Sequence, residues 1–393
     1  MKKLCVVTGT RSEYGLLYPL IKKLEQIHTF KVFLAVTGMH LSKEYGNTID
    51  FIKQDGIRID KEIPILSGDN SPVGITKSMG KALEQFGDYF DQLSPDMVII
   101  LGDRYEIFSV AAAAAVLNIP IAHLHGGEIT LGAYDEFFRH SITKMSCLHF
   151  TSCEEHRKRV IQLGENPKRV FNVGAIGIEN IKNMSLLTLK ELEESINFSL
   201  DQEYGLVTFH PVTLEKYSVE EQCKTLLKVI SQISDMRFII TKANADDGGK
   251  IINTMLDNFA KKYPEKISLH SSLGQIRYLS AMKYASFVLG NSSSGLIEAP
   301  TFHIPTVNIG NRQRGRVYGK TVINCDTTEK AILNAISLAR DKNFKKQILS
   351  APNPYGDGNV SDKIVKKIAA YLDTYPKGIV KDFYDIEFEV KNL

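Results

Sequence analysis

The chain alternates short apolar runs with longer stretches of helical periodicity. In the first half the apolar runs are LCVVTG, KVFLAVTG, DMVIILG and IPIAHLHGG, with helical segments after the first and the third. Short apolar runs bounded by glycine or proline are typical of strands buried on both faces, and their alternation with helices predicts a parallel sheet. The first half is therefore predicted to be a doubly wound α/β domain.

A second series of the same kind begins near residue 204, with the runs YGLVTFHP, MRFIITKAN, ASFVLGNSSSG and IPTVNIG. The polar stretch 183–202 carries no strand pattern, so we place the boundary there. We predict two Rossmann-like domains, residues 1–184 and 185–366, followed by a helix or tail over 367–393. The cleft between two such domains is the expected ligand site, because strand carboxyl ends and topological switch points open onto a crevice.

The composition limits the classes of ligand or partner that the chain is expected to bind. The chain has 48 Lys and Arg against 45 Asp and Glu, a formal charge of +3, with no long block of one sign. This argues against a dedicated nucleic-acid or membrane surface and leaves small anionic substrates open. The apolar run from Leu4 to Val7 is too short for a signal peptide, so we expect a cytoplasmic protein. The five cysteines contain no CxxC pair and are expected to be reduced.

Polar or glycine-containing clusters follow nearly every predicted strand of the first half. Arg11, after Gly9 and Thr10, suits an anion at a helix N-terminus, although a plain turn with a solvated arginine fits as well. Asp103 and Arg104 follow another strand, where Asp103 serves either as a helix cap or in catalysis.

The next strand leads to Glu128, and Asp135 comes shortly after it. If strand order follows chain order, the Asp103 and Glu128 clusters lie side by side, and their carboxylates suit general acid and base roles. His123 and His125 form an HxH pair that can bind zinc, but further ligands at a suitable spacing are not evident, so we expect no metal.

In the second half, His210 ends a strand, where it serves either a phosphate or a purely structural role. Ser292 and Ser293 follow another strand and are expected to open a helix that runs through Glu298, as a phosphate cradle or a simple N-cap. No GxxxxGK[ST] motif is present, which argues against a Walker-type site. The basic segment around Arg312 fits a solvated loop or a nucleotide contact.

Taken in order, GTR, GDR, HLHGGE, DEFFRHSITK, FHP, GNSSSG and NIGNRQRGR resemble the hydrolysing UDP-N-acetylglucosamine 2-epimerases of sialic-acid-type pathways, from about residue 4 to about residue 370. The resemblance implies a glycosyltransferase-B-like fold: two Rossmann-like domains, an active site in the cleft between them, and a C-terminal helix within 360–375 that returns to the first domain. It also implies a homo-oligomer, dimer or tetramer, that needs no cofactor.

The activity implied by the resemblance converts UDP-N-acetylglucosamine and water to N-acetylmannosamine and UDP, in nonulosonic (sialic) acid biosynthesis. H-2 of the sugar is barely acidic, so departure of UDP must lead, giving a glycal that water then attacks. The resemblance assigns catalytic roles to Asp103, Glu128 and Asp135, without separating acid from base. It assigns the diphosphate to Arg11, Arg104, His210, Ser292 and Ser293, the ribose hydroxyls to Glu298, and the nucleotide side to Asn244 and Arg312.

Several alternatives stay open at this point. Residues 12–15 vary among related members and are expected to form a loop near the sugar. A UDP- or GDP-linked 2,4-diacetamido-2,4,6-trideoxyglucose, as in legionaminic acid pathways, is therefore the alternative substrate. A non-hydrolysing 2-epimerase would release no free sugar, and a glycosyltransferase would need an acceptor. A metal-dependent hydrolase would be sensitive to chelators, and a sensor would bind without turnover.

Overall fold

A computed structural model describes residues 1–44, 46–69, 71–129, 134–211, 218–243, 249–375 and 380–387. The chain divides into two compact units. Unit 1 comprises Met1–Asn180 together with Gly358–Leu393, and unit 2 comprises Ile181–Asp357. The C-terminal segment thus belongs to the same unit as the N-terminus.

Unit 1 is built on a seven-stranded sheet in the order β3-β2-β1-β4-β5-β6-β7, in which every pairing is parallel. Its strands are β1 (Lys2–Thr8), β2 (Phe30–Thr37), β3 (Lys61–Ile63), β4 (Met97–Leu101), β5 (Ile121–Leu124), β6 (Leu148–Thr151) and β7 (Val170–Asn172). The order reverses at β1 and β4, as in doubly wound folds.

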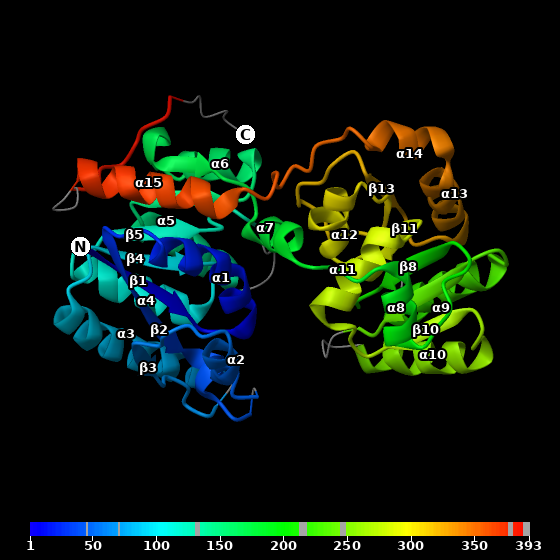
Figure 1. Ribbon diagram of the computed structural model, residues 1–393, viewed down its shortest axis with the longest axis horizontal. Helices are drawn as coiled ribbons and strands as arrows, with labels where there is room; N and C mark the ends of the chain where they lie inside the picture. Colours follow the sequence, from blue (N-terminus) through cyan, green and yellow to red (C-terminus); the bar gives the residue numbers. More distant parts are fainter. Residues whose placement is uncertain are drawn as a thin grey trace, which may run out of the picture. The chain divides into compact units, whose positions relative to one another are not determined.

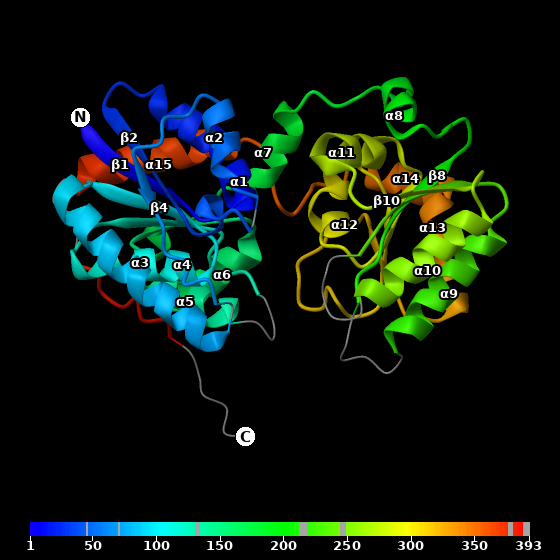
Figure 2. The same cartoon turned by 90° about the horizontal axis from the view of Figure 1, so that it is seen from below.

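Helices cover both faces of this sheet (Figures 1 and 2). The bounds are α1 (Arg11–Glu25), α2 (Ile49–Gln54), α3 (Pro72–Leu93), α4 (Tyr105–Val116), α5 (Asp135–Met145), α6 (Glu154–Gln162), α7 (Ile176–Asn183) and α15 (Val360–Thr374), with short 3-10 helices at Gly38–Leu41 and Pro167–Arg169. Helices α3, α4 and α5 share one apolar core with the sheet, and α1, α2 and α15 share the other. Helix α15 packs against α1 and shares its apolar core.

The alternation of side chains along β1 explains why both faces are covered. Leu4 and Val6 belong to the core under α1, whereas Cys5 and Val7 belong to the core under α3 and α4, and all four are fully buried. A strand with apolar residues at every position has no face that can meet water. The continuous apolar runs of the sequence therefore require the two-sided covering that is seen.

Unit 2 repeats the plan with a six-stranded parallel sheet in the order β10-β9-β8-β11-β12-β13. Helices α9, α10 and α13 share one apolar core with the sheet, and α8 and α11 share the other (Figure 2). Its strands are β8 (Tyr204–Thr208), β9 (Arg237–Thr241), β10 (Ile267–His270), β11 (Phe287–Gly290), β12 (Thr306–Ile309) and β13 (Val322–Cys325). Its helices are α8 (Leu189–Ile196), α9 (Val219–Gln232), α10 (Gly249–Lys262), α11 (Gly274–Tyr284), α12 (Ser294–Ile297), α13 (Glu329–Arg340) and α14 (Lys342–Ile348), with a 3-10 helix at Ala299–Phe302.

Two local expectations were wrong. Residues 12–15 form the first turn of α1 and not a loop, because Thr10 caps the helix by accepting from the Glu13 amide, and Glu13 and Tyr14 are buried. The helix after Ser293 stops at Ile297, and Pro300 follows in a 3-10 turn, since proline has no N–H for a further helical bond.

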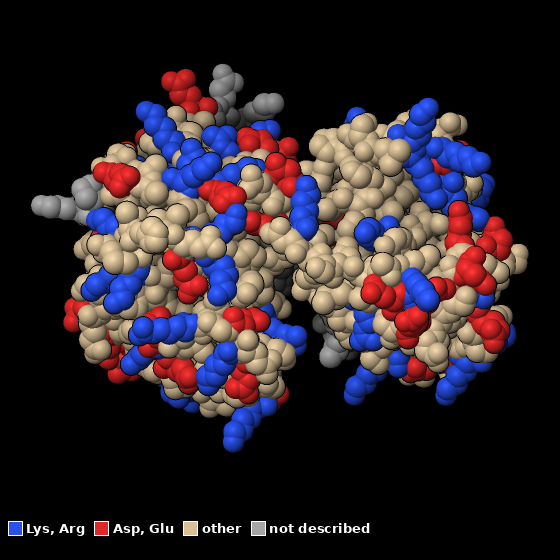
Figure 3. Space-filling view, in the orientation of Figure 1, with Lys and Arg blue, Asp and Glu red and all other residues tan. Residues whose placement is uncertain are grey.

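The surface carries both signs of charge. Figure 3 shows Lys and Arg interspersed with Asp and Glu on the visible face of each unit, in keeping with the near balance of the composition. Within the described parts of the chain, every helix is too short or too polar to cross a membrane.

Candidate active site

The strand ends predicted to gather polar residues do meet in unit 1. Strands β4 and β5 are neighbours, and the ladder extends beyond them, since the Gly102 amide donates to Leu124 (3.0 Å) and the His125 amide donates to the Phe150 carbonyl of β6 (2.9 Å). The carboxyl ends of parallel strands lie on one edge of the sheet. The clusters after β4 and β5 therefore lie side by side, as expected, and the end of β6 lies next to them.

Arg139 on α5 connects this edge. Its guanidinium is buried and forms an ion pair with Asp103. It also donates to the Glu128 backbone carbonyl (3.0 Å) and to the Glu136 carboxylate (3.3 Å). Asp103 is not the cap of α4, because Arg104 occupies that position and no side chain caps the helix. A planar guanidinium with several donors suits such bridging, and it fixes the distance between the two loops.

Glu128 accepts two further hydrogen bonds at Oε1. His125 Nδ1 lies 3.0 Å away and Ser152 Oγ donates at 2.8 Å, while Ser152 also contacts His156 Nδ1 at 2.8 Å. Burial by itself would raise the pKa of Glu128, but the charge and hydrogen bond of His125, together with His156 and Ser152, lower it to about 2. Gly127, at φ +79°, permits this fold of the loop, because a Cβ there would collide with the His156 carbonyl.

The two histidines of the HxH pair have different surroundings. His123 is fully buried, with Nε2 2.8 Å from the Gly102 carbonyl and Nδ1 3.2 Å from Thr143 Oγ1, whereas His125 faces Glu128. Burial lowers the pKa of His123 to about 3. Among the described residues, no group of three or more His, Cys, Asp and Glu side chains is arranged to hold a metal ion.

Arg104 interacts with two buried acidic residues, Glu106 and Glu13. Its Nε is 2.5 Å from Glu106 Oε1, and Glu106 is fully buried. Glu13, also buried, accepts from the Gly9 amide (2.8 Å), and burial together with the nearby Glu106 raises the pKa of Glu13 to about 7. Asp135 is half-buried at the start of α5, where burial raises its pKa and the charge of Arg104 opposes the shift.

Arg11 is separate from this cluster. It is the first residue of α1, it is exposed, and its guanidinium lies 4.0 Å from the centroid of the Phe51 ring. A cation over an aromatic ring is held only weakly at an exposed site. The structure brings together Asp103, Glu128 and Arg139, whereas Arg11 lies apart from them at the start of α1.

In unit 2 the buried Asn291 connects several segments by hydrogen bonds, as Arg139 does in unit 1. Its Oδ1 accepts from the His210 amide (2.7 Å) and its Nδ2 donates to the His210 carbonyl (2.8 Å). The Asn291 carbonyl accepts from Gln313 Nε2 (2.7 Å) and Arg312 Nη1 (3.2 Å). Gly290, at φ +136°, makes the approach possible, because a Cβ there would collide with the Thr208 carbonyl. Predicted residues from two distant segments, His210 and Arg312, are thus held by one asparagine.

A series of hydroxyl groups leads to the predicted serine cluster. Thr208 lies 2.7 Å from Thr241, Tyr278 lies 3.4 Å from Thr208 and 2.6 Å from Ser294, and the Ser294 hydroxyl donates to Ser292 (3.0 Å). These side chains line a cavity of about 370 Å³ that also includes His210 and Lys242. The cavity offers hydroxyl and cationic groups to a polar ligand.

The remaining predicted residues of unit 2 lie nearby or outside the described chain. Ser293 is the N-cap of α12 but makes no side-chain capping bond, so the simple cap is not its role. Glu298 is the C-cap of the same helix, and burial raises its pKa to about 7. Asn244 lies outside the described residues.

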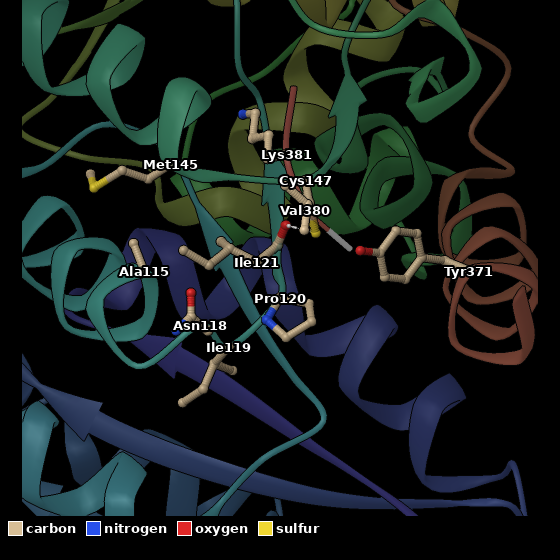
Figure 4. A pocket seen from close by; sticks show the side chains of 10 residues that line it. All are labelled: Ala115, Asn118, Ile119, Pro120, Ile121, Met145, Cys147, Tyr371, Val380 and Lys381. Atoms are coloured by element: carbon tan, nitrogen blue, oxygen red, sulfur yellow. Dashed lines mark hydrogen bonds between the residues drawn. The ribbon is translucent and has the colours of Figure 1, made fainter. Parts of the chain in front are cut away.

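Another cavity, of about 470 Å³, lies at the opposite end of β5, where Pro120, Ile121 and Cys147 face Tyr371 and Lys381 of the C-terminal segment (Figure 4). It contains none of the predicted site residues. The Lys381 ammonium donates to the carbonyls of Lys144 (2.7 Å) and Ser146 at the end of α5. Because these carbonyls are the unpaired ones of a helix end, the contact anchors the C-terminal segment.

Sequence reasoning singled out neither Arg139, Ser152 and His156 in unit 1 nor Asn291, Thr241 and Tyr278 in unit 2. One signal was available for Arg139, which precedes the buried Ile142 and Thr143 by three and four positions and so shares their helix face. A charged residue on the buried face of a helix needs a partner. No comparable sequence signal marks Ser152 or Tyr278.

Comparison with known proteins gives consistent matches. A model of the UDP-N-acetylglucosamine 2-epimerase family matches residues 22–369. The polysialic acid biosynthesis protein P7 of Escherichia coli is 46% identical over 387 residues, covering 98% of both chains. The GDP/UDP-N,N'-diacetylbacillosamine 2-epimerase (hydrolyzing) of Campylobacter jejuni is 43% identical, covering 98% of this chain and 99% of its own.

Among solved structures, the UDP-GlcNAc 2-epimerase of Neisseria meningitidis bound to UDP-GlcNAc superposes with a TM-score of 0.76 at 19% identity, covering 94% of this chain and 100% of that chain. At this level of identity the likeness shows the fold alone, two parallel α/β sheets of the type predicted from the sequence.

Proposed function

The chain belongs to the UDP-N-acetylglucosamine 2-epimerase family, and we propose that it catalyses the hydrolysing form of the reaction, converting UDP-N-acetylglucosamine and water to N-acetylmannosamine and UDP. We further propose that it acts in the cytoplasm, as a homo-oligomer, in nonulosonic (sialic) acid biosynthesis. The polysialic acid biosynthesis relative, 46% identical over nearly its whole length, supports this pathway.

The proposed chemistry begins with departure of UDP from C1, which gives C1 oxocarbenium character and makes H-2 removable. Loss of H-2 forms the C1=C2 double bond of a glycal. Water then adds to C1 while a proton returns to C2 from the opposite face, which inverts C2 and releases the free sugar. Two proton-transfer groups on opposite faces of the ring are required, each in the protonation state that its step needs.

The observation that carries the proposal is the cluster formed by Arg139, Asp103 and Glu128 at one edge of the unit 1 sheet. Arg139 holds one carboxylate through an ion pair and the other loop through its backbone carbonyl. Carboxylates positioned in this way either transfer a proton themselves or orient a neighbouring group that does so. Asp135, whose carboxyl is half-buried and close enough to Arg104 to feel its charge, completes the proposed catalytic set.

The unit 2 residues are proposed to bind the nucleotide diphosphate. The His210 backbone is held by the oxygen and the nitrogen of the Asn291 side-chain amide, and the Ser292 hydroxyl accepts from Ser294, so the His210 backbone and the Ser292 side chain are positioned before a ligand binds. Preorganised donors stabilise a leaving diphosphate by several kcal/mol in a desolvated site. Arg11, Arg104, Ser293 and Arg312 are proposed as further diphosphate and nucleotide contacts, Glu298 as the ribose contact, and Asn244 as a nucleotide contact.

A second substrate is favoured by the relative from Campylobacter jejuni, which is named as a hydrolyzing 2-epimerase of GDP/UDP-N,N'-diacetylbacillosamine and is 43% identical over nearly the whole chain. The alternative is therefore the same reaction on a UDP- or GDP-linked 2,4-diacetamido-2,4,6-trideoxyglucose. Both substrates share the leaving diphosphate and the C2 proton, so the same residues serve either reaction.

The test is a proton NMR time course of the purified protein with UDP-N-acetylglucosamine in deuterated water, with and without EDTA. Free N-acetylmannosamine with deuterium at C2, formed together with UDP at an EDTA-independent rate, is the expected result. Epimerised sugar still linked to UDP would indicate the non-hydrolysing reaction. No turnover here, followed by turnover of the diacetamido sugar nucleotides under the same conditions, would establish the alternative substrate.

A further inference from the structure

The loop after β5 holds a histidine that the reaction described so far does not use. His125 has a left-handed backbone, with φ +66°, and its Nδ1 lies 3.0 Å from Glu128 Oε1. Its Nε2 is buried, and no hydrogen-bond partner for it exists among the described residues. A buried ring nitrogen without a partner is costly, so its retention needs an explanation.

The hydrogen bond to Glu128 decides which nitrogen of His125 carries the proton. An ionised carboxylate only accepts, so Nδ1 must be the donor, and in the neutral form of the ring the lone pair lies at Nε2. Ser152 donates to the same Glu128 oxygen (2.8 Å) and is itself contacted by His156, which keeps that carboxylate oriented. A carboxylate that orients an imidazole and leaves Nε2 bare is the arrangement found where histidine acts as a base.

The other histidine of the same strand shows the contrast. His123 has a protein partner at both ring nitrogens, the Gly102 carbonyl and the Thr143 hydroxyl. Its role is therefore structural. His125, two residues later, lies at the sheet edge that also carries Asp103, because the Gly102 amide pairs with Leu124 just before it.

Backbone strain supports a functional role for His125. A residue with a Cβ is less stable in the left-handed region than in the right-handed region. Such strain persists where the surrounding contacts enforce it, and it concentrates at functional sites. Here the Glu128 contact and the close packing of Gly127 against His156 hold the turn.

We propose that His125 is the base that removes the C2 proton in the elimination step, and that Glu128 is its positioning residue; this rests on the function proposed above. The Nε2 lone pair takes the proton, the C2–H electron pair becomes the second bond between C1 and C2, and the C1–O electron pair leaves with UDP. The proton that returns to C2 from the opposite face comes from a second group.

The structure suggests an unusual test variant. Because residue 125 has φ +66°, glycine fits the backbone without strain, and His125→Gly leaves a space of imidazole size beside Glu128. We expect elimination, followed as UDP release from UDP-N-acetylglucosamine, to fall at least about 100-fold. The UDP Kd should stay within about threefold, because the proposed diphosphate ligands are untouched. Added imidazole should raise the elimination rate of the variant at least about tenfold, which it could not do if the loss came from a structural defect.

Two further variants complete the design. Asparagine also tolerates the left-handed backbone, but its side chain fills the space that glycine leaves. The His125→Asn variant should therefore lose turnover without recovering it when imidazole is added, while its thermal unfolding temperature stays that of the wild type. His28→Ala removes an exposed histidine of the same unit and should behave as the wild type with and without imidazole. In Glu128→Gln, the amide can still contact His125, and the elimination rate should fall with UDP affinity retained.

The outcomes separate the two proposals. A wild type without turnover of any of the sugar nucleotides overturns the proposed function and the role of His125 together. An active wild type with equally active His125→Gly and His125→Asn overturns only the role of His125. Release of UDP with accumulation of glycal in His125→Gly also overturns it, because elimination would then proceed without the histidine.

Discussion

Arg139 and Asp103 form an ion pair between α5 and the end of β4, and the same guanidinium donates to the Glu128 carbonyl after β5. One arginine thus sets the spacing of the two loops that carry the proposed carboxylates. Since both partners of the pair have little contact with water, the position of Asp103 depends on the geometry of Arg139 as well as on its charge.

Replacing Arg139 by lysine keeps the charge and removes the planar set of donors. We expect Arg139→Lys to lower kcat/KM at least about tenfold and the free energy of unfolding by about 1–3 kcal/mol, since buried acceptors lose their partner. Steady-state kinetics and urea unfolding measure the two effects. The control is Arg58→Lys, because the Arg58 side chain is exposed where it pairs with Asp60 (3.0 Å), and it should change stability by less than about 1 kcal/mol.

Asp103→Asn tests the carboxylate itself. Asparagine keeps the shape but cannot take or give a proton in the same way, so turnover should fall at least about 100-fold while UDP affinity, measured by calorimetry, changes little. The control is Asp96→Asn at the other end of the same strand, where Asp96 holds Lys2 (3.0 Å) and the Lys3 amide (2.7 Å). Wild-type turnover in Asp103→Asn would remove Asp103 from the catalytic set.

The Asn291→Ala variant tests the nucleotide binding that is proposed for unit 2. Loss of the amide frees both backbone groups of His210, so we expect the UDP Kd to rise at least about tenfold and the free energy of unfolding to fall by about 1–3 kcal/mol. Asn308→Ala on β12 also removes a buried amide, bonded to Asn324 (2.8 Å), and should cost stability alone. Equal UDP affinity in both variants would contradict a role of Asn291 in binding.

Glu13 predicts a pH dependence of stability. Its pKa in the folded state is about 7, raised from 4.5 by burial and by Glu106. Between these values the folded state keeps a proton that the unfolded chain has lost, so the free energy of unfolding falls as pH rises, by up to about 3 kcal/mol.

Unfolding in urea at a series of pH values compares the wild type with Glu13→Gln, in which the neutral amide can still accept from Gly9. The variant should lose less stability between pH 5 and pH 8 than the wild type. Glu25→Gln, at an exposed position of the same helix, should follow the wild-type profile. Parallel curves for the wild type and Glu13→Gln would show that Glu13 does not titrate in this range.

The sequence by itself determined the fold class, the family and the strand ends at which polar side chains gather. Strand β4 is apolar at every position and β1 is apolar from Leu4 to Val7, so both must be covered on both faces, which is a local property of the chain. Asp103 and Glu128 were predicted as site residues for a related reason, since a polar residue shortly after a buried strand reaches the sheet edge. The ordered motifs then identified the family, which the family model and the relatives confirm.

Tertiary structure decided which of these residues meet. Arg139 reaches Asp103 only because β4 and β5 are neighbours, and Asn291 reaches His210 only because β11 lies beside β8. The sequence predicted the first adjacency but gave no partner for either residue. The split of HxH into a structural His123 and a bare His125 Nε2 was also invisible, because it depends on backbone dihedrals and on the Gly102 carbonyl from another strand. Apolar periodicity is set by near neighbours in the chain, whereas side-chain partners are set by strand order and turn geometry, and only the folded chain fixes those.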